Sequence, residues 1–145
     1  MLVQDAILQA QKKTGIGSDQ PDLPAGSLLE IWQQAVFDSA AYPAYTCLGQ
    51  TLSYGEVDQL SRRVASYFQK KLKLVAGDRI AVQLPNLIQY PVVVVAAWKL
   101  GLVIVNTNPL YTVRELVHQF NDSGAKAVVV LDQFYQTLCQ ALPDT

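Results

Sequence analysis

Hydrophobic and polar residues follow a helical period in several segments, and these segments begin with the same short motif. Ser27 with Glu30, Ser53 with Glu56 and Thr112 with Glu115 each fit the capping box. In this motif a hydroxyl and a carboxylate bind the first free backbone N–H groups of a helix. Asn86 with Gln89 is a weaker copy. Apolar residues then recur on one helix face: Val57, Leu60, Val64 and Phe68 after Ser53, and Val113, Leu116, Val117 and Phe120 after Thr112. Gly124 is a natural end for the last of these helices.

Short β-rich runs lie between the helices, at residues 45–48, 50–52, 79–84, 102–105 and 127–131. The first two predict a small hairpin. The last three are nearly continuous apolar runs, which are typical of parallel strands buried on both faces. The four valines at 92–95 suit a strand as well, but we interpret residues 86–100 as a helix because parallel strands need a crossover of about a dozen residues. The predicted class is α/β: a mostly parallel β-α-β sheet with helices on both faces, an N-terminal hairpin and a last helix at 132–142.

Residues 1–26 differ from the rest and predict an N-terminal arm, followed by a domain over 27–145. Val3, Ala6, Ile7 and Ala10 form an apolar stripe on one short helix, and residues 14–26 are rich in Gly, Pro, Ser and Asp. Such a short helix is barely stable alone. Two interpretations stay open, a helix that docks on another surface and a frayed tail.

Composition and charge restrict the class of protein. Half of the residues are hydrophobic and 16% are charged, which is typical of a globular chain. The formal net charge is −1, so we expect no nucleic-acid partner, and we interpret "QKKLK" (69–73) as the end of a helix. Cys47 and Cys139 match no metal spacing and predict small buried side chains in a reducing compartment. Without a signal peptide or an apolar run of ~20 residues, we expect a cytoplasmic protein, at most peripheral on a membrane.

Ligands of open α/β sheets bind beyond the carboxyl ends of the strands. Asn86, Asn106 and Asn108 follow predicted strands and are therefore the candidates for the edge of a site. Ordinary turn chemistry is the favoured alternative, because asparagine often bonds its own backbone at such turns.

Motifs for catalysis are absent from the sequence. There is no GxGxxG, no GxxxxGK[ST] and no GxSxG. Asp122 and Asp132 lie too far apart in sequence to argue for a Mg²⁺ site, and His118, near Arg114 and Glu115, fits an exposed helical position. Three tyrosines near turns are expected to pack over strand ends: Tyr54, Tyr90 and Tyr111. We therefore assign no catalytic, cofactor-binding or metal-binding residue to this chain.

Two stretches together carry a family resemblance. "TLSYGEVDQLSRRVASYFQKKLKLVAGDRIAVQLPN" (51–86) and "AAWKLGLVIVNTNPLYT" (96–112) resemble the first two signatures of the AMP-forming acyl-CoA synthetase superfamily. "PNLIQYP" and "NPLYTVRELVHQFNDSGAKAVVV" are most similar to bacterial long-chain fatty-acid–CoA ligases. The resemblance covers residues 27–142. Val113 departs from the usual proline and Leu100 from a small residue, and neither position carries known family chemistry.

The resemblance implies the N-terminal part of the large domain of an adenylate-forming enzyme, here an incomplete subdomain over 27–145. It implies an acid–thiol ligase that uses ATP, Mg²⁺ and coenzyme A: a fatty acid and ATP give an acyl-adenylate and pyrophosphate, and the thiol of coenzyme A then displaces AMP. The family motifs for these steps come after this region, so we expect an N-terminal fragment that is inactive alone.

Several questions stay open under this resemblance. Members of the family are in some cases homodimers or peripheral membrane proteins, and the arm is where we expect either property. One alternative is an adenylating ligase for an aryl, short-chain or amino acid. The other is a truncated, non-catalytic interaction module.

Overall fold

The described part of the chain, residues 26–145 of the computed structural model, is an α/β fold in which helices cover both faces of a small sheet and a hairpin lies farther out, beside the helices. The predicted arm helix and nearly all of the linker lie outside the described residues. The elements are, in chain order, α2 (Leu28–Ser39), β1 (Pro43–Cys47), β2 (Gln50–Ser53), α3 (Tyr54–Lys70), β3 (Arg79–Gln83), α4 (Gln89–Leu100), β4 (Val103–Asn106), α5 (Val113–Ser123), β5 (Ala127–Val130), η1 (Asp132–Phe134), α6 (Tyr135–Ala141) and η2 (Leu142–Asp144).

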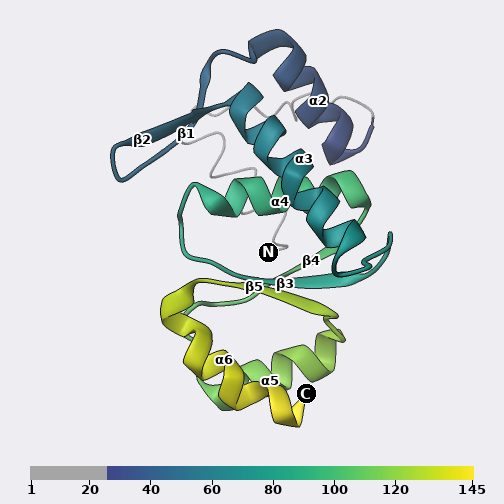
Figure 1. The fold of residues 1–145 in the computed structure, drawn as a ribbon, viewed down its shortest axis with the longest axis vertical. Helices are drawn as coiled ribbons and strands as arrows, with labels where there is room; N and C mark the ends of the chain where they lie inside the picture. The colour runs from purple at the N-terminus through teal and green to yellow at the C-terminus, as the bar shows by residue number, and fades with distance from the viewer. Residues whose placement is uncertain (1–25) are drawn as a thin grey trace, which may run out of the picture.

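The three-stranded sheet is parallel and has the order β4-β3-β5, so β3 is central. Helices α3 and α4 lie on one side of the sheet, and α5 and α6 lie on the other (Figure 1). The chain moves outward from β3 to β4 and then back past β3 to β5. Because crossovers between parallel strands are almost always right-handed, reversing the direction puts α4 and α5 on opposite faces. The predicted α/β class with helices on both faces is therefore confirmed.

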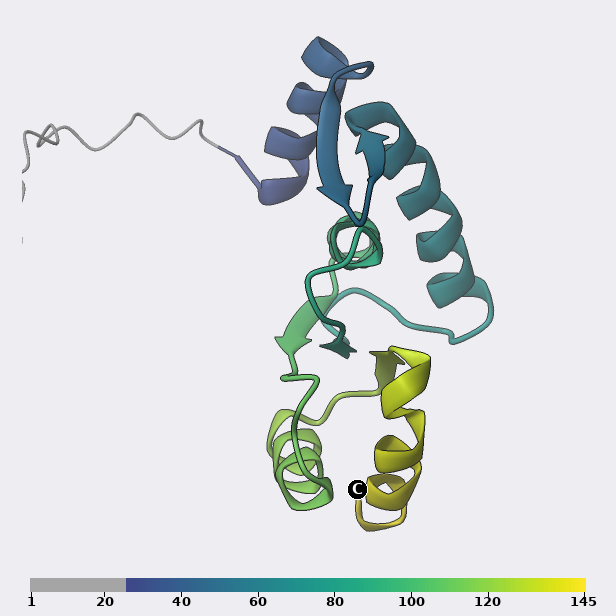
Figure 2. The same cartoon turned by 90° about the vertical axis from the view of Figure 1, so that its left-hand side faces the viewer.

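Apolar residues form a core on each face of the sheet and a third cluster farther out. Ile80 and Val82 of β3 point to the α3–α4 face, and Ala81 points to the α5–α6 face with Leu116 and Phe120. The third cluster joins α2, α3 and α4 next to the hairpin (Figure 2), and its buried members are Trp32, Val57, Val92 and Val95. These contacts hold the sheet between two helical layers.

The expectation that all three parallel strands are buried on both faces is correct only for β3. After Arg79 every residue of β3 is buried, whereas β4 and β5 contain half-buried and exposed positions. The physical reason is the strand order. Within the described chain, β4 and β5 are edge strands with a hydrogen-bonded neighbour on one side only.

Three of the four predicted helix starts are confirmed. Ser27, Ser53 and Thr112 are N-caps with complete capping boxes, and Gly124 ends α5 in the left-handed conformation with φ of 61°. The fourth is wrong: α4 begins at Gln89 and its cap residue, Ile88, makes no side-chain cap bond. Pro91 in the first turn has no N–H, so this helix start has one donor fewer to satisfy.

The hairpin is also confirmed, with β1 antiparallel to β2. Its two turn residues, Leu48 and Gly49, both have positive φ, which matches the right-handed twist of the strands. The prediction of two buried cysteines is wrong. Cys47 is half-buried at the end of β1, and Cys139 is exposed on the outer side of α6. No helix among residues 26–145 is long and apolar enough to cross a membrane.

Candidate functional site at the carboxyl edge of the sheet

The carboxyl ends of the parallel strands lie at one edge of the sheet, where α/β proteins bind ligands. Strand β3 ends at Gln83, β4 at Asn106 and β5 at Val130, and Gln83 is the register partner of Val130. Of the three candidate asparagines, Asn106 is the last residue of β4 and Asn108 lies in the turn that follows. The third, Asn86, follows β3 and is exposed.

Turn chemistry accounts for Asn108. Its Oδ1 accepts a hydrogen bond from the backbone N–H of Leu110 at 3.0 Å, and its carbonyl accepts one from the N–H of Tyr111 at 3.1 Å. Asn106 differs, because its Oδ1 accepts a 2.8 Å hydrogen bond from the hydroxyl of Tyr90. The Asn106 side chain thus ties the end of β4 to α4, which is a contact between distant residues and not turn chemistry.

Two glutamines that were not predicted as site residues bind backbone carbonyls of the segment from Asn106 to Pro109. Gln83 Nε2 donates to the carbonyl of Pro109 at 3.4 Å, and Gln119 Nε2 donates to the carbonyl of Asn106 at 3.1 Å. The Oε1 atom of each glutamine is buried and has no partner among the described residues. A glutamine at the end of an apolar strand is a visible signal in the sequence, although its partner is not.

An apolar groove of about 500 Å³ opens beside this edge, between α3, the β3–α4 connection and β5. Its lining includes Leu84, Ile88 and Leu131, and within residues 26–145 Arg63 is the one charged residue that lines it. Among the described residues that line the groove there is no serine, histidine, cysteine or carboxylate. Another apolar surface could pack into this groove. Its described lining residues offer no nucleophile or general acid.

The remaining predicted candidates do not converge on this edge. His118 is exposed on α5, in a shallow depression with Thr112, Arg114 and Glu115. Tyr90 and Tyr111 pack against the two cores of the sheet, whereas Tyr54 packs against Trp32, with ring centroids 5.5 Å apart. No group of three or more His, Cys, Asp or Glu residues among positions 26–145 is arranged to hold a metal ion.

The strongest electrostatic feature lies away from the sheet edge, where α2, α3 and α4 meet. The buried carboxylate of Asp58 accepts hydrogen bonds from Lys99 Nζ at 2.6 Å and Trp32 Nε1 at 3.3 Å, and Arg62 Nη2 lies 2.7 Å from its second oxygen. Burial opposes ionisation of Asp58, but the bonds from Lys99 and Trp32 and the two positive charges outweigh it. The pKa of Asp58 is therefore lowered. This cluster joins three helices and faces no groove with a reactive group.

A second carboxylate, Asp78, plays a local role at the opposite edge of the sheet. Its Oδ1 atom lies 2.5 Å from Lys126 Nζ, and its Oδ2 atom accepts a 2.9 Å hydrogen bond from the N–H of Val75. These two contacts lower the pKa of Asp78. Glu115 has a lowered pKa as well, because it accepts the backbone and side-chain bonds of Thr112 in the capping box. Both pKa shifts therefore come from contacts that stabilise the fold.

The described residues do not fit a nucleotide-phosphate site. A phosphate cradle needs several free backbone N–H groups beside glycines. The described glycines lie elsewhere: Gly26 before α2, Gly49 in the hairpin turn, Gly55 in α3, Gly77 before β3, and Gly101 and Gly124 at helix ends. At the carboxyl edge, Asn108 already uses its side chain within its own turn. We therefore place no ATP, coenzyme A or Mg²⁺ contact on these residues.

Comparison with known proteins shows the family. The family described as "AMP-binding enzyme" matches residues 32–144. Long-chain-fatty-acid–CoA ligase of Escherichia coli O6:H1 is 42% identical over 82% of this chain and 21% of its own length. The enzyme of the same name from Haemophilus influenzae is 45% identical over 77% of this chain and 20% of its own length.

Solved structures agree with the sequence relatives. A benzoate–CoA ligase from Burkholderia xenovorans superposes with a TM-score of 0.75 at 26% identity, over 81% of this chain and 24% of that chain. The chain spans about a fifth of the length of the curated relatives it matches. The predicted resemblance is confirmed, and the chain belongs to the family of AMP-binding enzymes.

Proposed function

We propose that this chain forms the N-terminal α/β layer of an ATP-dependent long-chain fatty-acid–CoA ligase. The observation that carries the proposal is the identity of 42–45% to ligases of that name, over more than three quarters of the chain. Such a ligase joins a fatty acid to coenzyme A in two steps, through an acyl-adenylate, with release of pyrophosphate and AMP. ATP, Mg²⁺ and coenzyme A are then ligands of the enzyme as a whole.

In this proposal the described residues act as scaffold. The carboxyl edge has a turn that is fixed by Tyr90, Gln83 and Gln119, beside a groove with an apolar lining. Neither feature supplies a reactive group, so the chemistry has to come from residues that follow this layer in the enzyme. We propose residues 1–26 as an arm and 27–145 as an incomplete N-terminal subdomain of the ligase domain.

Two experiments test the proposal. The reading frame that encodes the chain should continue into a Thr/Ser/Gly-rich loop that ends in lysine, because this loop holds the phosphates of ATP in the family. ATP–pyrophosphate exchange by the isolated 145 residues should be at background, whereas the longer protein should be active. A reading frame without that loop, or exchange by the isolated residues, would contradict the proposal.

The likeness to a benzoate–CoA ligase supports a second candidate class of substrate, the aryl acids. A panel of acids in a coenzyme A ligation assay separates the two. Long-chain acids should react faster than aryl and short-chain acids, and a preference for aryl acids over both other classes would make this an aryl–CoA ligase.

We also propose a cytoplasmic location, with peripheral contact to the inner face of the membrane and a homodimeric assembly. The half-exposed edge strands β4 and β5 support a tendency of the isolated residues to associate, because edge strands with unpaired backbone groups pair readily with other chains. Light scattering on the isolated 145 residues should detect association. A monodisperse monomer with cooperative unfolding would instead favour an autonomous module.

A further inference from the structure

The formal net charge of −1 conceals a strong separation of charge along the sequence. Residues 59–114 contain eight lysines and arginines and a single acidic residue, Asp78. Two of the eight, Arg62 and Lys99, pair with Asp58 in the cluster between the helices. The densest group of the others is Lys70, Lys71 and Lys73, at the end of α3.

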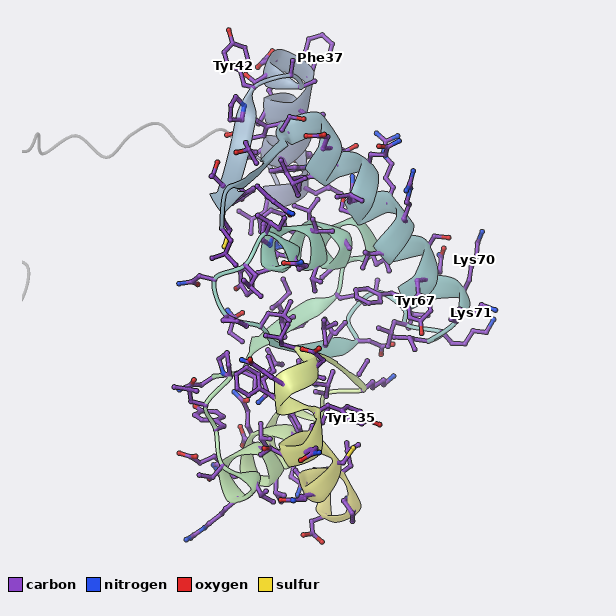
Figure 3. All side chains as sticks on the ribbon, turned by 60° about the vertical axis from the view of Figure 1, so that its left-hand side comes forward. Phe37, Tyr42, Tyr67, Lys70, Lys71 and Tyr135 are labelled. Carbon is purple, nitrogen blue, oxygen red and sulfur yellow. The ribbon has the colours of Figure 1, made fainter. Side chains whose placement is uncertain are left out.

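The end of α3 projects these lysines from the surface. Lys70 is the last residue of the helix and Lys71 is its C-cap. Lys73 follows in the left-handed conformation, with φ of 58°. Tyr67 lies three and four residues before Lys70 and Lys71, and residues at this spacing share one helix face. Figure 3 shows Tyr67, Lys70 and Lys71 on the same side of the molecule, at the end of α3.

Exposed apolar side chains lie beside the lysines in the sequence: Tyr67 before them, Leu72 among them and Val75 after them. The exposed fractions are 55% for Tyr67, 41% for Leu72 and 62% for Val75. The segment is nevertheless anchored, because Leu74 is buried in the core with Phe68 and its N–H donates to the Phe68 carbonyl at 3.1 Å. We call the six exposed residues the basic apolar patch: Tyr67, Lys70, Lys71, Leu72, Lys73 and Val75.

No acidic side chain neutralises this patch among the described residues. None of its three lysines makes an ion pair with residues 26–145. The nearest acid in sequence is Asp78, which is buried and holds Lys126 and the N–H of Val75. Its negative charge is therefore already balanced, and the positive charge of the lysines faces outward.

We propose that the basic apolar patch binds the surface of an anionic phospholipid membrane. Lysines attract acidic headgroups over a Debye length, and the apolar side chains beside them enter the boundary between headgroups and acyl chains. A nucleic acid would satisfy the lysines but would bury neither Leu72 nor Val75. This inference rests on the membrane contact proposed above and assigns it to a surface.

The location of the patch fits this role. The end of α3 leads into the start of β3, so the patch lies at the amino edge of the sheet. The turn after β4 and the apolar groove lie at the carboxyl edge. A protein held by the patch therefore keeps the candidate functional edge away from the lipid.

The test measures binding of the protein to vesicles of equal parts phosphatidylcholine and phosphatidylglycerol. A patch variant carries Lys70→Gln, Lys71→Gln and Lys73→Gln. The control carries Arg114→Gln, Gln136→Glu and Gln140→Glu, which changes the net charge equally at exposed positions of the α5–α6 layer. Circular dichroism checks that both variants fold, and residues 1–25 stay unchanged in both.

Each lysine near an anionic surface strengthens binding about fivefold, so the patch variant should bind on the order of a hundredfold more weakly, and the control should bind like the parent. Leu72→Ser with Val75→Ser should weaken binding at high salt, where the electrostatic part is screened. Equal binding by patch and control variants would overturn the proposal. So would equal binding to pure phosphatidylcholine, or tighter binding to an oligonucleotide than to vesicles. Ligation activity is measured separately, so a failure here is distinct from a failure of the proposed function.

Discussion

Replacing Asp58 by Asn tests whether the buried cluster of Asp58, Lys99 and Trp32 stabilises the contact between α2, α3 and α4. The Lys99 side chain is 14% exposed and that of Asp58 is 8% exposed. Removing one partner of a buried ion pair typically costs about 3–5 kcal/mol, because the other charge stays in a poorly solvated place. Lys99 retains some contact with water, so we expect Asp58→Asn to lower the free energy of unfolding by about 3 kcal/mol.

Urea unfolding followed by tryptophan fluorescence measures this loss directly, because Trp32 and Trp98 both belong to the cluster beside Asp58. Arg62→Gln is the matched control. Arg62 contacts the same carboxylate, but its side chain is 73% exposed, so its loss should cost less than about 1 kcal/mol. A double variant, Asp58→Asn with Lys99→Met, removes both buried charges and should be more stable than Asp58→Asn alone.

The sign of the pH dependence gives a second check. The pKa of folded Asp58 is lowered from an ordinary value of 3.8, so its contribution is fully present above that value and is lost as the pH falls through the folded pKa. The parent should therefore lose stability faster than Asp58→Asn as the pH falls below about 4. A cost of Asp58→Asn no larger than that of Arg62→Gln, with the same acid dependence as the parent, would refute the reasoning.

Three further substitutions address single features of the fold, each measured by urea unfolding. Lys73→Gly should leave stability unchanged or raise it by up to about 1 kcal/mol, because glycine relieves the left-handed strain but gains freedom in the unfolded chain; a clear loss would show that the lysine side chain stabilises the fold. Thr112→Ala should cost about 1 kcal/mol through loss of the α5 cap, whereas Thr137→Ala, outside any cap, should be nearly neutral. Gln83→Met should stabilise by about 1 kcal/mol, since it removes a buried oxygen without a partner at the cost of one long bond to Pro109; destabilisation would reveal a buried partner for that oxygen.

Features that depend on residues close in sequence were predictable. The capping boxes join residues three apart, so Ser27, Ser53 and Thr112 could be identified without knowledge of the fold. The start of α4 was missed because nothing local distinguishes Asn86 as a cap from Asn86 in a preceding turn. The helix begins at Gln89 instead.

Features that depend on distant residues were not predictable in the same way. Asp58 and Lys99 are 41 positions apart, and Gln83 and Pro109 are 26 apart. Gln83 and Lys99 are visible in the sequence as polar residues among apolar neighbours, but the partner of each is defined only by packing. The edge positions of β4 and β5 likewise follow from the strand order, which a single apolar run does not encode. The lack of catalytic residues at the candidate site remains a prediction from the missing motifs.

The strand order also has a consequence for folding during synthesis. Strand β4 follows β3 directly in the chain order of strands, so α3, β3, α4 and β4 are able to assemble before α5 and β5 have left the ribosomal exit tunnel. The last strand, β5, then adds to the free side of β3 once α5 has left the exit tunnel. Until that moment Ala81, at the centre of the α5–α6 face, is exposed together with the open backbone of β3. During the interval between the emergence of β4 and of β5, one side of β3 is therefore open to pairing with other strands.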